Sequence, residues 1–353
     1  MKYHPLGRTG LRVSQLSLGT MTFGDDWGWG ASAEESTAVL NAYLDAGGNF
    51  VDTANVYTGG SAERILGAAL QGRRDEVVLS TKFNAPRRAG DVNAAGNHRK
   101  NLVSSLEESL TRLRTDYVDV YWVHARDTFT PVAEVMRALD DQVRAGKVRY
   151  VGVSDWPAWE IAQANTLAEL RGWTPFAGLQ LRYNLLERSP ELDLLPMAGT
   201  FDIGVLAWGP LAEGRLTGKY LSGEGGRLDV YDWGGEGDEE TAKRVVAEVV
   251  AVAQEVGRSP AQVALAWLRD RGPGVIPIVG VTRRSQLADN LASLELRLDN
   301  DQVRRLDKVS EPRGTFPHNF VRTPQITEVV YGDRWRDIED RRRASRRTVN
   351  DVL

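Results

Sequence analysis

The segment Val51-Asp52-Thr53-Ala54-Asn55-Val56-Tyr57 decides how this chain is expected to fold. The apolar run Asn49–Val51 is typical of a buried strand, and the aspartate follows it directly. Two later apolar runs also end on a polar side chain, at Lys82 and at His124. In a closed barrel of parallel strands, the carboxyl ends of all strands meet on one face. We therefore expect the lysine and the histidine to lie beside the aspartate and tyrosine of the opening segment.

Strand and helix patterns alternate along most of the chain. Each predicted strand is followed by a helical pattern at a spacing that suits parallel crossovers. Eight such units favour a (β/α)₈ barrel, an α/β fold, over a doubly wound sheet, which does not usually need eight units in one domain. The predicted strands are Gln15–Leu18, Asn49–Asp52, Val77–Lys82, Val118–His124, Tyr150–Ser154, Leu179–Leu181, Gly204–Trp208 and Gly274–Val279.

The two ends of the chain fall outside this repeat. Lys2–Val13 has two short extended runs around a glycine-rich turn and predicts a hairpin before the barrel. Leu298–Val309 has the pattern of an additional helix. We expect one barrel domain over residues 1–315 and a charged tail over 316–353 that is not a separate domain.

Composition excludes several classes of protein. The chain has 353 residues, and 42% hydrophobic and 26% charged residues are ordinary values for a globular enzyme. A net charge of -4 offers no basic field for nucleic acid. The absence of cysteine excludes disulfides and thiolate catalysis, and four scattered histidines favour no metal site. Because no signal peptide or membrane-spanning run is visible, we expect a cytoplasmic protein without a membrane partner.

The four polar residues suit the reduction of a carbonyl group. A carbonyl that accepts a hydride must also receive a proton, and a Tyr57 hydroxyl donates one readily if a neighbouring Lys82 ammonium stabilises its anion. Asp52 would hold the lysine in place, and His124 would orient the carbonyl oxygen by a hydrogen bond. Each residue alone is an ordinary strand-end polar group, but their occurrence on three successive strands favours a catalytic site.

These residues make the chain resemble the aldo-keto reductases from Lys2 to about Pro312. Asp-Thr-Ala-x-x-Tyr at Asp52–Tyr57, Thr81-Lys82 at a strand end and His124 match that family's four catalytic residues. The resemblance implies a (β/α)₈ barrel that binds NADPH without a dinucleotide-binding fold. It is consistent with the absence of a G-x-G-x-x-G motif between a strand and a helix.

The resemblance also implies a set of cofactor contacts at the strand ends. Ser154, the residue after it and Gln180 would hold the carboxamide, Trp208 would stack on the nicotinamide ring, and the glycine-rich loop beyond it would approach the phosphates. Arg283 would bind the 2′-phosphate, which favours NADPH over NADH. The full predicted set is Gly19, Thr20, Met21, Asp52, Ser154, Asp155, Gln180, Trp208, Gly209, Pro210, Leu211, Gly214, Lys219, Arg227, Gly280, Thr282, Arg283, Gln286, Asp289 and Asn290.

Three positions in or beside the predicted cofactor contacts depart from the family pattern. Asp155 stands where an asparagine is usual, and it either contacts the carboxamide or caps the next helix. Gly209 replaces a serine, which removes one hydroxyl contact. Arg182 replaces a more usual acidic residue, and its role stays open.

A small aldehyde or ketone is the expected partner. Its predicted pocket consists of loop residues near the catalytic groups, namely Met21, Phe23, Trp27, Trp29, Tyr57, Phe83, Asn84, His124 and Trp233. Two other functions remain open from the sequence. One is a cofactor-sensing regulatory subunit, which His124 argues against, and the other is a phosphate-binding barrel isomerase or lyase.

Overall fold

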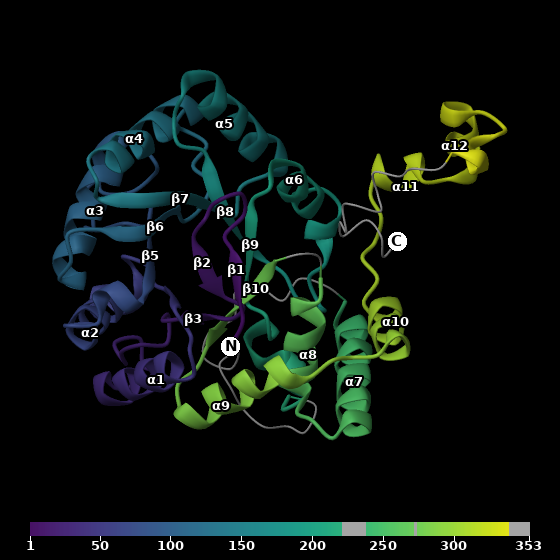
Figure 1. The fold of residues 1–353 in the computed structure, drawn as a ribbon, viewed down its shortest axis with the longest axis horizontal. Coiled ribbons are helices and arrows are strands. Elements are labelled where there is room, and N and C mark those ends of the chain that lie inside the picture. Colours follow the sequence, from purple (N-terminus) through teal and green to yellow (C-terminus); the bar gives the residue numbers. More distant parts are fainter. Residues whose placement is uncertain (221–237, 272–273, 339–353) are drawn as a thin grey trace.

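Eight parallel strands close into a barrel with helices around its outside (Figure 1). The computed structural model describes residues 1–220, 238–271 and 274–338. Neighbouring strands follow the order β10-β3-β4-β5-β6-β7-β8-β9. The predicted (β/α)₈ barrel is confirmed, and the doubly wound alternative is wrong because the sheet is closed. The strands are β3 (Ser17–Gly19), β4 (Phe50–Asp52), β5 (Val78–Phe83), β6 (Val118–Val123), β7 (Val148–Ser154), β8 (Phe176–Arg182), β9 (Gly204–Trp208) and β10 (Val275–Gly280).

The helices begin where capping side chains are available. Ser32 accepts a hydrogen bond of 3.2 Å from the backbone N–H of Glu35. Ser259 caps α8 ahead of Pro260, and Asp299 forms a reciprocal capping box on α10. The helices are α1 (Ala33–Asp45), α2 (Ser61–Ala69), α3 (Arg99–Leu113), α4 (Val132–Arg144), α5 (Ala158–Arg171), α6 (Leu194–Phe201), α7 (Glu239–Val256), α8 (Pro260–Arg269), α9 (Arg284–Ala292) and α10 (Asn300–Val309).

An N-terminal hairpin closes one end of the barrel. Strands β1 (Tyr3–Pro5) and β2 (Arg12–Ser14) pair antiparallel, as predicted. Leu6 and Val13 are fully buried in a cluster that also contains Trp122 and the inward-facing residues of several barrel strands. The hairpin therefore plugs the end of the barrel opposite to the carboxyl ends of the strands.

Trp122 fills the middle of the barrel, and two glycines make room for it. A Cβ atom at Gly152 would lie 2.2 Å from the Trp122 ring, and one at Gly178 would lie 2.6 Å from it. Since real Cβ atoms do not approach so closely, these positions on β7 and β8 require glycine. The barrel interior is therefore packed solid below the polar residues at the strand ends.

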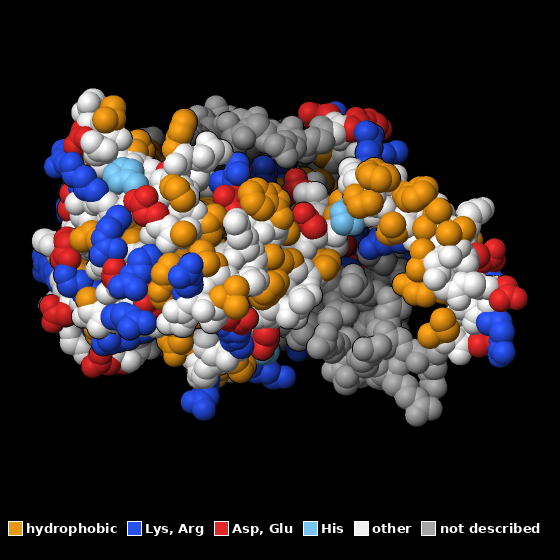
Figure 2. All heavy atoms as spheres, turned by 90° about the horizontal axis from the view of Figure 1, so that it is seen from above, with side chains coloured by type: hydrophobic (Ala, Val, Ile, Leu, Met, Phe, Trp, Pro, Cys, Tyr) orange, Lys and Arg blue, Asp and Glu red, His pale blue; other side chains and the backbone are white. Residues whose placement is uncertain are grey.

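A C-terminal extension projects from the barrel beyond α10 (Figure 1). It contains α11 (His318–Val321) and α12 (Pro324–Tyr331), two helices that were not predicted within the charged tail. The pair Thr323-Pro324 was the available signal, because proline is favoured in the first turn of a helix. Figure 2 shows hydrophobic side chains gathered over this extension, at Phe316, Phe320, Val321, Val329, Val330, Tyr331 and Ile338. No helix in the described part of the chain is long and apolar enough to span a membrane.

Candidate active site

Lys82 lies at the centre of the polar groups on the carboxyl face. Its ammonium pairs with the carboxylate of Asp52, and it donates hydrogen bonds of 2.8 Å to the Thr53 carbonyl and 3.0 Å to the Tyr57 hydroxyl. These contacts use the three donors that an ammonium has. With 1% of its surface exposed, Lys82 is held rigidly between the acid and the tyrosine.

Strand pairing brings these groups together. The side chains of a strand alternate between its two faces, so Lys82 points into the barrel and Phe83 points outward. Beyond β4, the backbone N–H groups of Thr53 and Asn55 still donate to carbonyls of β5, at 3.0 and 3.1 Å. This extended pairing carries the chain across the barrel mouth to Tyr57.

His124 completes the group from the next strand. It follows β6 directly, and its backbone N–H donates to the Phe83 carbonyl at 3.0 Å. The imidazole stands edge-on to the Tyr57 ring, with 5.9 Å between the ring centroids. A carbonyl oxygen at the barrel mouth can therefore meet both the tyrosine hydroxyl and the imidazole.

Burial and charge set the protonation states of the site. Burial raises the pKa of Tyr57, and the neighbouring Lys82 cation opposes this rise. Burial by itself would lower the pKa of Lys82, but the adjacent Asp52 raises it above its ordinary value. Burial and the Lys82 charge lower the pKa of His124 to about 3. At neutral pH the site therefore has a protonated tyrosine, an ammonium and a neutral imidazole.

Two further side chains fix the carboxylate of Asp52. Its Oδ1 accepts hydrogen bonds of 2.7 Å from the Ser80 hydroxyl and 2.7 Å from the Gln180 amide. The sequence analysis missed Ser80, although its place two residues before Lys82 puts it on the same face of β5. Gln180, predicted as a cofactor contact, thus also positions the acid.

The ends of β7 and β9 are joined through Asp155. One carboxylate oxygen accepts from the Trp208 indole N–H at 3.0 Å, and the other accepts from the Ser154 hydroxyl at 3.1 Å. Desolvation of its carboxyl by the surrounding protein raises the pKa of Asp155. The next helix begins after Pro157 without a side-chain cap, so the capping alternative for Asp155 is wrong.

Arg182 bridges β8 and the loop after β9. Its guanidinium donates to the Glu213 carboxylate at 3.1 Å and lies 5.6 Å from the centre of the Trp208 ring. Neither Arg182 nor Glu213 had a predicted role. A pocket of about 390 Å³ opens beside them, lined by Asp155, Trp156, Leu179, Leu181, Arg182, Glu187, Ser189, Pro190, Leu194 and Trp208.

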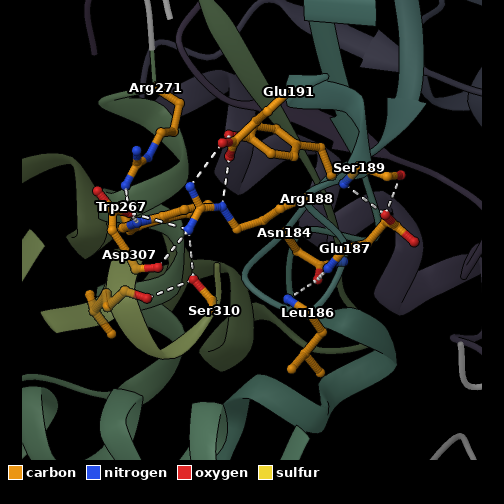
Figure 3. A network of polar contacts seen from close by, with 12 residues as sticks. Asn184, Leu186, Glu187, Arg188, Ser189, Glu191, Trp267, Arg271, Asp307 and Ser310 are labelled. Carbon is orange, nitrogen blue, oxygen red and sulfur yellow. Dashed lines mark hydrogen bonds and ion pairs between the residues drawn. The ribbon is translucent and has the colours of Figure 1, made fainter. Parts of the chain in front are cut away.

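The loop after β8 is held by the polar network of Figure 3. Arg188 forms two hydrogen bonds with Glu191, of 2.7 and 2.8 Å, and donates to Ser310 beyond α10 at 3.0 Å. In the same loop, Asn184 donates to the Gly209 carbonyl at 2.8 Å. These bonds therefore connect the loop after β8 both to the end of α10 and to the loop that follows Trp208.

The end of β10 contains the other predicted cofactor residues. Thr282 donates from its backbone N–H to the Gln286 side chain at 2.8 Å, and Arg283 is exposed at the N-cap of α9. Asp289 accepts from Ser259 at 2.8 Å and Gln262 at 2.6 Å, so both its oxygens hold the start of α8. These hydrogen bonds give Asp289 a structural role at the start of α8, and the adenine contacts of Asp289 and Asn290 stay predictions.

The remaining predicted residues fall into three groups. Gly19 ends β3 beside Asp52, and Thr20 follows it with a backbone hydrogen bond of 2.9 Å to the Asp52 carbonyl. Met21, Trp27 and Trp29 belong to the loop after β3, where the two tryptophan rings are 5.5 Å apart. Pro210, Leu211, Gly214 and Lys219 follow Trp208, and Gly280 ends β10. Arg227 and Trp233 lie outside the described residues.

Two predicted substrate contacts are wrong. Phe23 and Phe83 are fully buried in the main hydrophobic core, with no exposed surface. Phe83 points outward because Lys82 points inward, and its ring stacks on Tyr121 at 5.0 Å. Neither ring reaches the barrel mouth.

The fold and the side chains define a class, a barrel oxidoreductase with an aspartate, lysine, tyrosine and histidine at its strand ends. Residues 15–311 match the aldo/keto reductase family, and the chain belongs to this family.

Curated relatives cover most of the chain. It is 36% identical to norsolorinic acid reductase of Aspergillus flavus, over 90% of this chain and 84% of that protein. It is 35% identical to an aryl-alcohol dehydrogenase [NADP(+)] of Phanerodontia chrysosporium, over 88% and 86%. It is 37% identical to the uncharacterized oxidoreductase YrpG of Bacillus subtilis, over 91% and 100%.

Proposed function

We propose that this protein reduces the carbonyl group of an aldehyde or ketone to an alcohol with NADPH. The observation that supports this proposal most directly is the 3.0 Å hydrogen bond from the Lys82 ammonium to the Tyr57 hydroxyl. A cation held this close to a partly buried tyrosine favours the release of its proton, because it stabilises the phenolate. His124 in the family's fourth position argues against a regulatory subunit without turnover.

The reaction divides between the cofactor and the protein. Bound NADPH supplies a hydride to the carbonyl carbon. Tyr57 donates the proton to the carbonyl oxygen, and Lys82 lowers the free energy of the resulting phenolate. Asp52 keeps Lys82 charged and in place, and neutral His124 holds the carbonyl oxygen by a hydrogen bond. Since these groups are fixed before substrate arrives, little reorganisation is needed in the reaction.

The residues at the strand ends fit a nicotinamide dinucleotide. Trp208 offers a flat ring that is held at its edge by Asp155, and Ser154 and Gln180 offer polar groups beside it. The loop from Gly209 to Lys219 and the start of α9 offer backbone N–H groups and cations for phosphates. Arg283 at that helix start favours the 2′-phosphate of NADPH. The NADP(+) in the name of one relative supports the same cofactor.

Aromatic carbonyl compounds are the first substrates to test. The name of one relative, an aryl-alcohol dehydrogenase, suggests aromatic substrates. The paired rings of Trp27 and Trp29 support this choice. Their loop is tied to the catalytic turn by hydrogen bonds of 2.8 Å from Thr58 to Phe23 and 3.1 Å from Ser61 to Asp26.

A tyrosine exchange tests the proposal. Tyr57→Phe should keep NADPH binding, measured by fluorescence titration, and lower kcat by at least about 10²-fold, the scale of general acid catalysis. Tyr117→Phe is the matched control, because the hydroxyl of this tyrosine donates to Asp75 at 2.9 Å on the outside of the barrel. A Tyr57→Phe variant with nearly wild-type kcat would show that the acid is another group.

A further inference from the structure

The ion pair of Arg182 and Glu213 joins two parts of the site that are 31 residues apart in sequence. Arg182 is the last residue of β8, and Glu213 belongs to the 3-10 turn Ala212–Thr217 in the loop after β9. The guanidinium is 3.1 Å from the carboxylate, and the side chains are 21% and 6% exposed. At this degree of burial the pair is more than a solvated surface contact.

The loop needs a stabilising contact such as this ion pair because its backbone is in an unfavourable conformation. Ala212 and Glu213 have φ angles of 48° and 54°, in the left-handed region that residues with a side chain rarely adopt. Gly214 follows with a φ of 93°. Two consecutive strained residues persist only where surrounding contacts hold them. Arg182 holds this turn through its ion pair with the Glu213 carboxylate.

The same guanidinium also lies against Trp208. The Arg182 Cζ atom is 5.6 Å from the centre of the indole ring, and Asp155 accepts the indole N–H at 3.0 Å. Glu213 packs on Gly209, where a Cβ would lie 3.6 Å from its Oε1. Arg182 therefore contacts both the aromatic residue and the loop that are proposed to meet the cofactor.

We propose that Arg182 is a positioning residue for the dinucleotide, acting through Trp208 and Glu213. This role rests on the proposed function. Arg182 neutralises a largely buried carboxylate in the loop expected to approach the pyrophosphate. Without this cation, Glu213 would repel the phosphates and the strained turn would lose its anchor. Since NADPH and NADH share the pyrophosphate and nicotinamide, Arg182 should support the binding of both equally, whereas Arg283 should act on NADPH alone.

A double-mutant cycle tests the role. We expect Arg182→Gln to raise the Kd of NADPH and of NADH by the same factor, about tenfold or more, because one partner of a buried pair is left uncompensated. Glu213→Gln should weaken binding less. The double variant should recover most of the affinity lost in Arg182→Gln, because no unpaired carboxylate remains. With saturating cofactor, kcat should change much less than Kd. Unchanged Kd values in Arg182→Gln, or a double variant weaker than both single variants, would overturn the proposal.

Hydrogen exchange without cofactor separates this proposal from the proposed function. Arg182→Gln should speed amide exchange in peptides that cover residues 209–220, and Arg8→Gln, which breaks the exposed Arg8–Glu169 pair, should not. Unchanged exchange in Arg182→Gln would show that the pair does not hold the loop. If the wild-type protein binds neither dinucleotide, the proposed function and the cofactor role of Arg182 both fail, while exchange still decides whether the pair anchors the loop.

Discussion

The side-chain amide of Gln180 donates a hydrogen bond of 2.7 Å to Oδ1 of Asp52, across 128 residues of sequence. Gln180 lies two residues before the carboxyl end of β8 and Asp52 ends β4, so the bond crosses the barrel near its mouth. It uses the nitrogen of the amide and leaves the oxygen for another donor. Gln180 thus connects the acid that holds Lys82 with the side of the mouth proposed to bind nicotinamide.

Replacing this amide tests the connection. Gln180→Met keeps a similar volume but removes the donor to a buried carboxylate, and a hydrogen bond to a charged group contributes about 1.5–3 kcal/mol. We expect kcat/KM to fall roughly ten- to a hundredfold. Gln180→Glu should be worse near neutral pH, because it places a second carboxylate against Asp52. Steady-state kinetics of both variants decide this, and a fully active Gln180→Glu enzyme would contradict it.

Cofactor choice should depend on Arg283. Loss of a charge-assisted phosphate contact costs about 1.5–3 kcal/mol, so Arg283→Ala should raise the Kd of NADPH roughly tenfold or more. The Kd of NADH should hardly change. The control is Arg284→Ala, whose backbone N–H is already bonded to Glu35 at 3.0 Å. Equal weakening of both cofactors in Arg283→Ala would instead indicate a contact with the shared phosphates.

The barrel could be predicted because the periodicity of hydrophobic residues marks the alternating strands and helices. The meeting of the four polar residues on one face then follows from the parallel order of the strands. The predicted strand Gly204–Trp208 agrees with β9 residue for residue. The error at Phe83 was avoidable, since alternation on β5 requires it to face away from Lys82.

Other parts of the site depend on contacts that local sequence does not encode. The Gln180–Asp52 bond and the Arg182–Glu213 pair arise only when the barrel closes and brings distant strand ends together. The same holds for the bond from Arg188 to Ser310, which spans 122 residues, whereas its other partner Glu191 is only three residues away. Pairs of this kind need a register between strands, which period and composition do not fix.

Arg188 should stabilise the fold rather than the reaction. The side chains of Arg188 and Glu191 are 4% and 3% exposed, so removing one partner leaves the charge of the other buried and uncompensated. We expect Arg188→Met to lower the free energy of unfolding by about 3–5 kcal/mol. The double variant Arg188→Met/Glu191→Gln should recover part of this loss. Denaturant titrations of the three proteins are the measurement, and a Glu191→Gln background that makes no difference would contradict the buried-pair explanation.

His124 should make stability depend on pH. Its pKa is about 3 in the folded protein against an ordinary 6.5, so below pH 6.5 the unfolded chain binds a proton that the folded protein does not. The contribution of His124 is therefore fully present above pH 6.5 and decreases as the pH falls towards 3, by at most about 1.4 kcal/mol per pH unit. His124→Gln should lose less stability than wild type between pH 7 and 5. Equal losses would mean that His124 is not neutral in the fold.

Asp155 gives the last prediction, because it places a carboxylate beside the ring proposed to hold nicotinamide. Its φ of 55° lies in the left-handed region, which asparagine and aspartate both tolerate. Asp155→Asn therefore keeps the shape of the side chain and an acceptor for the Trp208 indole N–H, and removes the charge and the acceptor for the Ser154 hydroxyl. The nicotinamide ring is positive in NADP⁺ and neutral in NADPH, so a nearby carboxylate should favour the oxidised form.

A unit charge a few ångströms away at an effective dielectric near 20 contributes about 2–4 kcal/mol before screening, and solvent in the open site reduces this. We expect Asp155→Asn to raise the Kd of NADP⁺ more than that of NADPH, with the ratio of the two changing about three- to tenfold. Both constants are measured at pH 8 and at one salt concentration. Ser154→Ala is the control, because it removes the hydroxyl that bonds to Asp155 and keeps the charge. An unchanged ratio in Asp155→Asn would show that the carboxylate serves only to hold Trp208.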